Sequence, residues 1–385
     1  MGSLMRTTIF LAFMLVVAAD VYAQSSSRLS PPGEDVRDRF QRADEGEEPP
    51  GDGALASQQV QAALNFGNDL WQAGKTEQAI ASYQQAVTLQ PSLFVAQHTL
   101  GLALYKLARY ATAITALKQA AHLGPRSDSW QYLGLSYYHA KDYKGAVDAF
   151  HQALLFGAAS AGLYSNLGFA YLQLHKPDDA RRAFETALRQ APKLIDANNG
   201  LCAAYSMSEQ FDLAIDACSR AVGWQPQSSL ANFVLGNAYF NLGQYESAIA
   251  PLELAIRFEP GEAPANLVLG KVYFKLQRYH EALTRFRHAH ELDPNLDEAL
   301  VGIGASCFKL GTYDEADRAF ERAVVINPDS LEAHYNLGIS CLRKKQHACA
   351  LTHYNYVKIH NPSLGQALFK LIYLDRIVDV TSINR

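Results

Sequence analysis

Alanine recurs along this chain of 385 residues at a nearly constant interval, and that spacing constrains the fold more than any other feature. Neighbouring alanines of the series are 34 residues apart, except for a single step of 33. The series consists of Ala79, Ala113, Ala146, Ala180, Ala214, Ala248, Ala282, Ala316 and Ala350. Such a period predicts one supersecondary unit that is repeated nine times, with each unit burying its apolar face against its neighbours.

Other residue types keep the same interval. A glycine stands twelve residues before the alanine in eight of the nine repeats, and Cys202 takes its place in the fifth. A large apolar residue precedes that position, and a proline follows the alanine by twelve residues in eight repeats. Because proline breaks the helical hydrogen-bond ladder, it predicts the end of a second helix. The small glycine and alanine side chains predict that two antiparallel helices approach closely within each repeat.

This pattern resembles the tetratricopeptide repeat, which has tryptophan, leucine, glycine, tyrosine, alanine, phenylalanine and proline at fixed offsets in 34 residues. The similarity covers roughly residues 60–362, about four-fifths of the chain, and five repeats carry the tyrosine. The resemblance implies an all-α fold, a right-handed α-solenoid of nine helix pairs. The repeats would start near residues 60, 94, 127, 161, 195, 229, 263, 297 and 331, and a capping helix would follow at 363–385.

The segment before the repeats suggests export. Residues 1–23 combine a basic start at Arg6, an uncharged and mostly apolar stretch and small residues at 21–23, which predicts a cleaved signal peptide. The alternative is an uncleaved membrane anchor, and only that case would place the protein on a membrane. We therefore expect the mature protein in the periplasm, in the cell envelope or outside the cell.

Residues 24–57 are rich in proline and glycine and contain four basic and eight acidic residues, which predicts a disordered acidic tether. Its net charge of −4 equals that of the whole chain, so the repeats are neutral overall. Nucleic-acid binding needs a clustered excess of lysine and arginine, and this composition argues against it. At the other end, the apolar content of the capping segment leaves a homodimer contact open.

Repeat nine concentrates cysteines and histidines, which are candidate metal ligands. Five cysteines are an odd number, so at least one thiol is unpaired, and Cys341 with Cys349 is the better candidate pair. Cys349 and His353 share a helix face, but Cys341 is expected in the core, so we predict no metal site. The catalytic motifs H-E-x-x-H, G-x-S-x-G and the P-loop do not occur in the sequence. We therefore expect neither an enzyme nor a cofactor.

The resemblance also implies that the first helices line a concave groove. An aromatic residue recurs at one groove position, and cations gather beside it in the last repeats. The predicted groove residues are Trp71, Tyr105, Tyr138, Asn166, Asn237, Phe240, Lys271, Phe274, Lys275, Phe308, Lys309 and Arg343. Rings, amides and cations together suit an extended peptide, and the cations favour an acidic one. The alternatives are that the aromatics pack between helices and that the cations are only solvated.

Two known subfamilies of this fold do not match. The lysine and asparagine clamp of chaperone-tail binders is absent, because Asp128 or Glu298 stands at a lysine position. The asparagine ladder of the sugar-transferring relatives is interrupted in most repeats. The sequence therefore predicts a non-enzymatic protein-interaction scaffold, and it does not identify the partner. The alternative is an accessory subunit of an envelope enzyme or assembly machine, anchored to a membrane if the signal segment is uncleaved.

Overall fold

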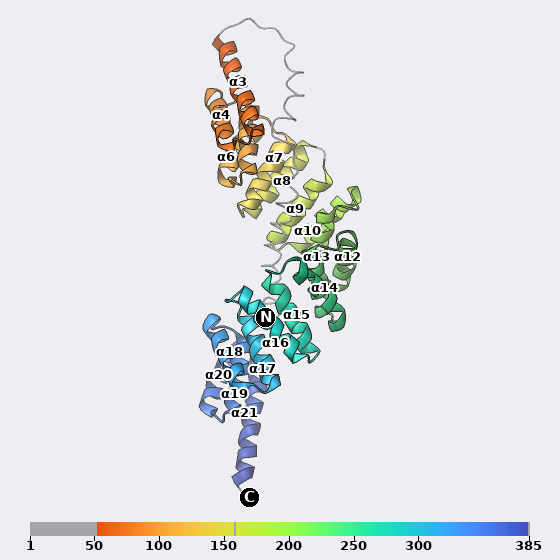
Figure 1. Cartoon of the computed structure of the whole chain (residues 1–385), viewed down its shortest axis with the longest axis vertical. Helices are drawn as coiled ribbons and strands as arrows, with labels where there is room; N and C mark the ends of the chain where they lie inside the picture. Colours follow the sequence, from red (N-terminus) through yellow and green to blue (C-terminus); the bar gives the residue numbers. More distant parts are fainter. Residues whose placement is uncertain (1–51, 158, 384–385) are drawn as a thin grey trace. The chain divides into compact units, whose positions relative to one another are not determined.

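The computed structural model describes residues 52–157 and 159–383, and all regular elements in these ranges are α-helices (Figure 1). The all-α prediction is therefore confirmed. The predicted signal peptide and residues 24–51 of the predicted tether lie outside the described ranges. Helix α3 begins at Asp52, so residues 52–57, which the sequence analysis assigned to the tether, are helical instead.

The described residues form two compact units, 52–210 and 211–383. The N-terminal unit contains α3 (Asp52–Gln72), α4 (Thr76–Leu89), α5 (Phe94–Lys106), α6 (Tyr110–Leu123), α7 (Ser127–His139), α8 (Tyr143–Phe156), α9 (Ala161–Gln173), α10 (Pro177–Gln190) and α11 (Ile195–Met207). The C-terminal unit contains α12 (Phe211–Trp224), α13 (Ser229–Asn241), α14 (Tyr245–Phe258), α15 (Ala263–Lys275), α16 (Tyr279–Leu292), α17 (Asp297–Leu310), α18 (Tyr313–Ile326), α19 (Leu331–Arg343), α20 (His347–His360) and α21 (Pro362–Ile383). Within each unit every helix packs against the next one along the chain.

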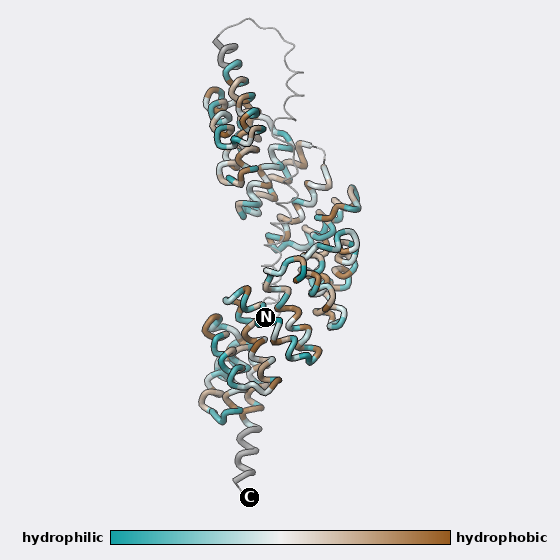
Figure 2. The backbone as a smooth tube through the Cα atoms, viewed as in Figure 1, coloured by the Kyte–Doolittle hydropathy of each residue, from teal (hydrophilic) through white to brown (hydrophobic). Residues whose placement is uncertain are grey.

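The glycine of the repeat makes room for a large side chain of the second helix. A Cβ atom added at Gly134 would lie 2.5 Å from the Phe150 ring, and one added at Gly168 would lie 2.6 Å from the Phe184 ring. Both rings are fully buried. The glycine and the large residue are 16 positions apart in each pair, and the same holds for Gly304 and Phe320. Apolar and polar residues mix along each helix, because each helix buries only part of its surface (Figure 2).

At junctions between repeats, a side chain of the next first helix forms a hydrogen bond with the backbone carbonyl of the repeat's proline. Asn232 Nδ2 donates a hydrogen bond of 2.9 Å to the Pro226 carbonyl, six residues earlier. Gln97, Asn198 and His334 make the same contact with the prolines that precede them. These polar side chains are buried, and burial without a partner would cost free energy. The contact therefore fixes where the next first helix begins.

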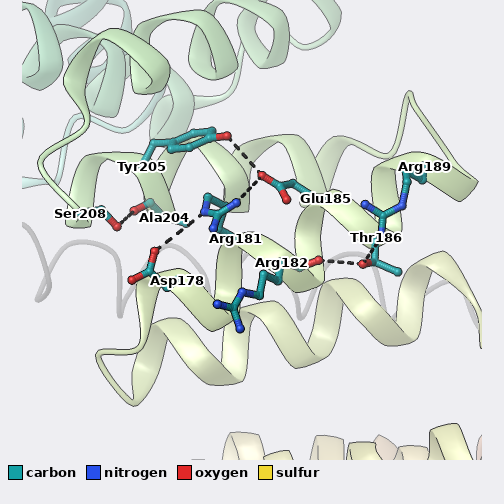
Figure 3. A network of polar contacts seen from close by, with 9 residues as sticks. All are labelled: Asp178, Arg181, Arg182, Glu185, Thr186, Arg189, Ala204, Tyr205 and Ser208. Carbon is teal, nitrogen blue, oxygen red and sulfur yellow. Dashed lines mark hydrogen bonds and ion pairs between the residues drawn. The ribbon is translucent and has the colours of Figure 1, made fainter.

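The recurring tyrosine joins neighbouring repeats. In Figure 3 the Tyr205 hydroxyl of α11 donates to Glu185 of α10 at 3.3 Å, and Arg181 donates to the same carboxylate at 2.9 Å. Tyr273 makes the equivalent bond to Glu253, 20 residues earlier, at 3.0 Å. The tyrosine of the repeat thus links its first helix to the second helix of the repeat before it, and its place in the motif has a structural cause.

The turn between the two helices of a repeat has one residue in the left-handed region. Glycine occupies it in three repeats, Gly74, Gly243 and Gly311. Six repeats place another residue there, at Ala108, Lys141, His175, Glu209, Gln277 and Lys345. A residue with a Cβ atom is strained in this conformation. At the five of these turns that lie within one unit, all except that of Glu209, the packing of the helices on either side holds the turn.

Helix α21 caps the ninth repeat. Leu368 is fully buried, and a Cβ atom at Gly338 of α19 would lie 2.7 Å from it. In earlier repeats that space is filled by the residue 16 positions after the glycine. In repeat nine that residue is Tyr354, which packs at the edge of the cluster formed by Cys341, Leu342, Ala350, Leu368 and Ile372. The cap thus supplies the apolar group that this repeat needs.

Candidate functional site

All twelve predicted groove residues lie on first helices. First helices of successive repeats contact one another within each unit: α5 with α7, α7 with α9 and α9 with α11 in the N-terminal unit, and α13 with α15, α15 with α17 and α17 with α19 in the C-terminal unit. We call this surface of each unit its first-helix face. The predicted residues on it are Trp71 of α3, Tyr105 of α5, Tyr138 of α7, Asn166 of α9, Asn237 and Phe240 of α13, Lys271, Phe274 and Lys275 of α15, Phe308 and Lys309 of α17, and Arg343 of α19.

The recurring aromatic of this face packs against a tyrosine that begins the second helix of its own repeat. The ring centroids of Phe274 and Tyr279 are 5.4 Å apart, and those of Phe308 and Tyr313 are 5.3 Å apart. Tyr105, Tyr138 and Phe240 make the same contact with the tyrosine five residues later. This partner was not predicted from the sequence, although a tyrosine recurs five residues after the aromatic. The aromatic series therefore has a structural role in the turn.

Burial separates the members of this series. Tyr105 and Tyr138 are each only 6% exposed, so neither presents its ring to a ligand. Tyr105 packs edge-on against Tyr132 of α7, and burial raises the pKa of Tyr138. For these two residues the packing alternative describes the structure better than the groove prediction. The rings of Phe240, Phe274 and Phe308 are only partly buried, as is that of Trp71.

The predicted basic run is partly neutralised by neighbouring acidic groups. Lys271 of α15 forms an ion pair with Glu298 of α17. The Arg343 guanidinium lies over the ring of Tyr313. Lys275 and Lys309 are exposed, and among the described residues neither forms an ion pair. The positive character of the face therefore comes from these two lysines and from the exposed Arg343, while Lys271 is neutralised.

The face of the N-terminal unit carries buried amides instead of cations. Asn199 of α11 is 1% exposed, and neither of its side-chain amide atoms has a hydrogen-bond partner. Gln173 Oε1 of α9 is likewise buried without a partner, and Asn166 on the same helix is 9% exposed. An unsatisfied buried amide is costly and uncommon in folded proteins. At 1% exposed, Asn199 is even less accessible than Tyr138, so its amide does not present itself to a ligand.

A separate pocket of about 340 Å³ lies in repeat nine, between α18, α19 and α20. Cys341 and Cys349 line it and are joined by a disulfide with a Cα–Cα distance of 5.8 Å. Cys341 with Cys349 is the better candidate pair in the sequence, and the predicted core position of Cys341 separates it from His353. The structure instead brings potential ligand atoms of all three residues within 4.8 Å of one another. Cys307 is a free, buried thiol.

Among the helices in the described ranges, we find none with enough length and apolar character to span a bilayer.

Family models match most of the repeat region. Models described as "TPR repeat" and "Tetratricopeptide repeat" match residues 67–108 and 304–344, 98–162, and 161–194. A model described as "Anaphase-promoting complex, cyclosome, subunit 3" matches residues 207–289 and 253–323. Together these matches run from residue 67 to residue 344 with a gap at 195–206.

Two curated relatives share part of the chain. An "Anaphase-promoting complex subunit 6" of Arabidopsis thaliana is 29% identical over 158 residues, which cover 39% of this chain and 29% of that protein. A "BBSome complex member BBS4 homolog" of Drosophila melanogaster is 28% identical over 138 residues, which cover 36% of this chain and 28% of that protein. The chain therefore matches less than a third of the length of either relative.

Solved structures share the fold. The structure described as "APC/C hetero-tetramer Cut9-Hcn1" has a TM-score of 0.54 at 15% identity and covers 81% of this chain and 76% of its own. A tetratricopeptide repeat protein from Parabacteroides merdae has a TM-score of 0.51 at 16% identity, with 65% and 99% covered. The 34-residue unit, its paired helices and these matches together show that the chain is a tetratricopeptide-repeat protein.

Proposed function

We propose that this protein is a non-enzymatic interaction scaffold that binds an extended segment of a partner protein along the first-helix face of its C-terminal unit. One observation carries the proposal. The partly exposed ring of Phe274 is followed by the exposed Lys275 on α15, and Phe308 and Lys309 repeat this pair on α17. The tetratricopeptide fold and the complex-subunit names of its relatives support the coarser role of a protein-interaction scaffold.

The spacing of the two pairs suits an extended chain. Helices in contact have axes about 8–10 Å apart, and a peptide in the extended polyproline II conformation rises about 3.1 Å per residue, with about three residues per turn, so every third side chain lies on one side. Every third residue of a bound segment would therefore reach the next phenylalanine and lysine pair. The rings would contact apolar side chains, and the ammonium groups would pair with carboxylates. Because Glu298 already pairs with Lys271, acidic residues of the ligand would meet Lys275 and Lys309 instead.

The test uses a fluorescent twelve-residue peptide with leucine and glutamate repeated every third residue, titrated against the full chain. Lys275→Glu combined with Lys309→Glu should weaken binding at least tenfold, and added salt should weaken binding to the wild type. The matched control is Arg257→Glu with Arg318→Glu, which makes the same charge change at exposed positions of α14 and α18. Equal losses in both double variants would contradict a site on the first-helix face.

The compartment and the assembly are further parts of the proposal. Export rests on the signal-like residues 1–23, and the intact mass of the mature protein would show whether cleavage follows Ala23. The alternative, an accessory subunit of a larger assembly, is favoured by the complex-subunit names of the two curated relatives. Cross-linking of cells, followed by capture of this chain, would distinguish a stable stoichiometric assembly from a transient peptide ligand.

A further inference from the structure

The pocket of repeat nine gathers metal-ligating side chains that the first-helix face does not use. Cys341 stands near the end of α19, and Cys349 and His353 are four residues apart on α20, which places them on one face of that helix. The two sulfur atoms and one imidazole nitrogen all lie within 4.8 Å of one another. Cys341 is 6% exposed, whereas Cys349 and His353 are partly exposed and line the pocket.

His353 is held by a second histidine. The Nδ1 atoms of His334 and His353 are 2.9 Å apart, and His334 Nε2 lies 2.9 Å from the Pro328 carbonyl. A carbonyl only accepts, so His334 donates from Nε2, and its Nδ1 accepts from His353 Nδ1. This tautomer leaves Nε2 of His353 with a free lone pair. A histidine ligand oriented through its other ring nitrogen is the usual arrangement around a protein-bound metal.

The carboxylate of Asp317, which lies in the same pocket, is engaged by other residues and does not occupy the three potential metal ligands. It pairs with Lys344 and accepts a hydrogen bond from the Ser340 hydroxyl. Asp317 is therefore not needed as a ligand.

We propose that reduction of the Cys341–Cys349 disulfide converts this pocket into a Zn²⁺ site formed by the two thiolates and His353. A thiol reductant supplies two electrons and two protons to break the S–S bond, and Zn²⁺ then displaces the two thiol protons. Two thiolates, a neutral imidazole and Zn²⁺ carry no net charge, which suits a partly buried site. The pocket leaves space for a water molecule or a partner's side chain as the fourth ligand.

The geometry allows both states. Tetrahedral zinc holds sulfur at about 2.3 Å, which separates two sulfur ligands by about 3.8 Å. With Cα atoms 5.8 Å apart, rotation of the cysteine side chains provides this separation without movement of the helices. Oxidation closes the site, because the disulfide removes two ligands. Bound zinc and the disulfide are therefore mutually exclusive, and the redox state of the surroundings determines which of the two is present.

The experiment measures zinc bound to the full chain after reduction by a phosphine and removal of excess metal. We expect one Zn²⁺ per chain in the reduced protein and none in the oxidised protein. Co²⁺ in place of Zn²⁺ should give a thiolate-to-metal charge-transfer band. Cys349→Ser should abolish binding, and His334→Ala should weaken it about 10- to 100-fold. The controls are Cys307→Ser, a free thiol elsewhere, and His360→Ala, at the exposed end of α20.

Any of three results would overturn the proposal. Reduced protein without zinc would show that the cysteines form only a structural disulfide. Equal zinc in the oxidised and reduced proteins would show that the metal binds elsewhere. If Cys349→Ser unfolds, as judged by circular dichroism, His353→Ala becomes the deciding variant, since it leaves the disulfide intact. Unchanged zinc affinity in that variant would exclude His353 as a ligand.

Discussion

Gly168→Ala and Gly162→Ala place the same methyl group on the same helix, α9, with opposite expected effects on stability. At Gly168 the new Cβ atom would lie 2.6 Å from the Phe184 ring, whereas at Gly162 it would meet nothing within 4 Å. Ordinary contact begins at 3.4 Å, so the ring would have to retreat by about 3.4 − 2.6 = 0.8 Å. The Phe184 ring has little room to move, because it is fully buried and Gly200 of α11, in the next repeat, packs closely against it.

The magnitude follows from two opposing terms. Replacing glycine by alanine in a helix gains about 1 kcal/mol of helix propensity, and this term is shared by both variants. Overpacking a filled core costs about 1–3 kcal/mol, and only Gly168→Ala incurs it. The free energies of unfolding of the two variants should therefore differ by about 1–3 kcal/mol, with Gly162→Ala the more stable.

Urea unfolding followed by circular dichroism measures this difference. Because a repeat protein need not unfold in one step, hydrogen exchange of α9 and α10 should be measured as well, and protection should fall locally in Gly168→Ala. Equal midpoints and equal exchange in the two variants would show that Phe184 has room to move. That result would contradict the argument that the glycine of the repeat exists to admit this ring.

Three further predictions concern stability. Ala214→Leu and Ala248→Leu should each cost about 1–3 kcal/mol in denaturant unfolding, since both alanines are fully buried, and wild-type curves for both would contradict the assigned register. Gln277→Gly should stabilise by about 0.5–1 kcal/mol, because Gln277 has a φ of 62°, and a lowered melting temperature would refute this. Burial and then Arg322 lower the pKa of His290, so as the pH falls His290 is protonated in the unfolded state before it is protonated in the folded state. The contribution of neutral His290 to the free energy of unfolding should therefore be fully present above the ordinary histidine pKa of about 6.5 and decrease as the pH falls below it, and the decrease should be less steep in His290→Gln.

The repeat pattern predicts the architecture so well because its marker residues act within one repeat or between neighbours. Gly168 and the buried ring 16 residues later are fixed by the geometry of two paired helices, and so is the proline carbonyl that Asn232 satisfies. The number of residues between such partners is the same wherever the contact recurs, so the periodicity of the sequence alone identifies them. The tyrosine partner of Phe274 is equally periodic, and a search for spacings of five residues would have found it.

The candidate binding residues are harder to predict because their availability depends on unique neighbours. Lys271 and Lys275 lie one helical turn apart on α15, yet the first pairs with Glu298 of the next first helix and the second is exposed. Tyr138 and Phe308 stand at the same repeat position, but only Tyr138 is fully enclosed. The repeat motif therefore specifies the backbone position of a side chain, whereas the side chains of neighbouring repeats determine whether it is accessible to a ligand.

Repeat nine depends on its neighbour in a different way. It packs against α21, and Leu368 of that helix fills the space over Gly338. Tyr354, at the usual ring position, packs at the margin of the apolar cluster instead. Cys341 takes the position at which five repeats carry tyrosine, and Cys349 stands just before Ala350 of the alanine series, where most other repeats carry a polar or small residue. Their disulfide and the pocket beside it therefore come from residues particular to this repeat, which the repeat motif does not specify.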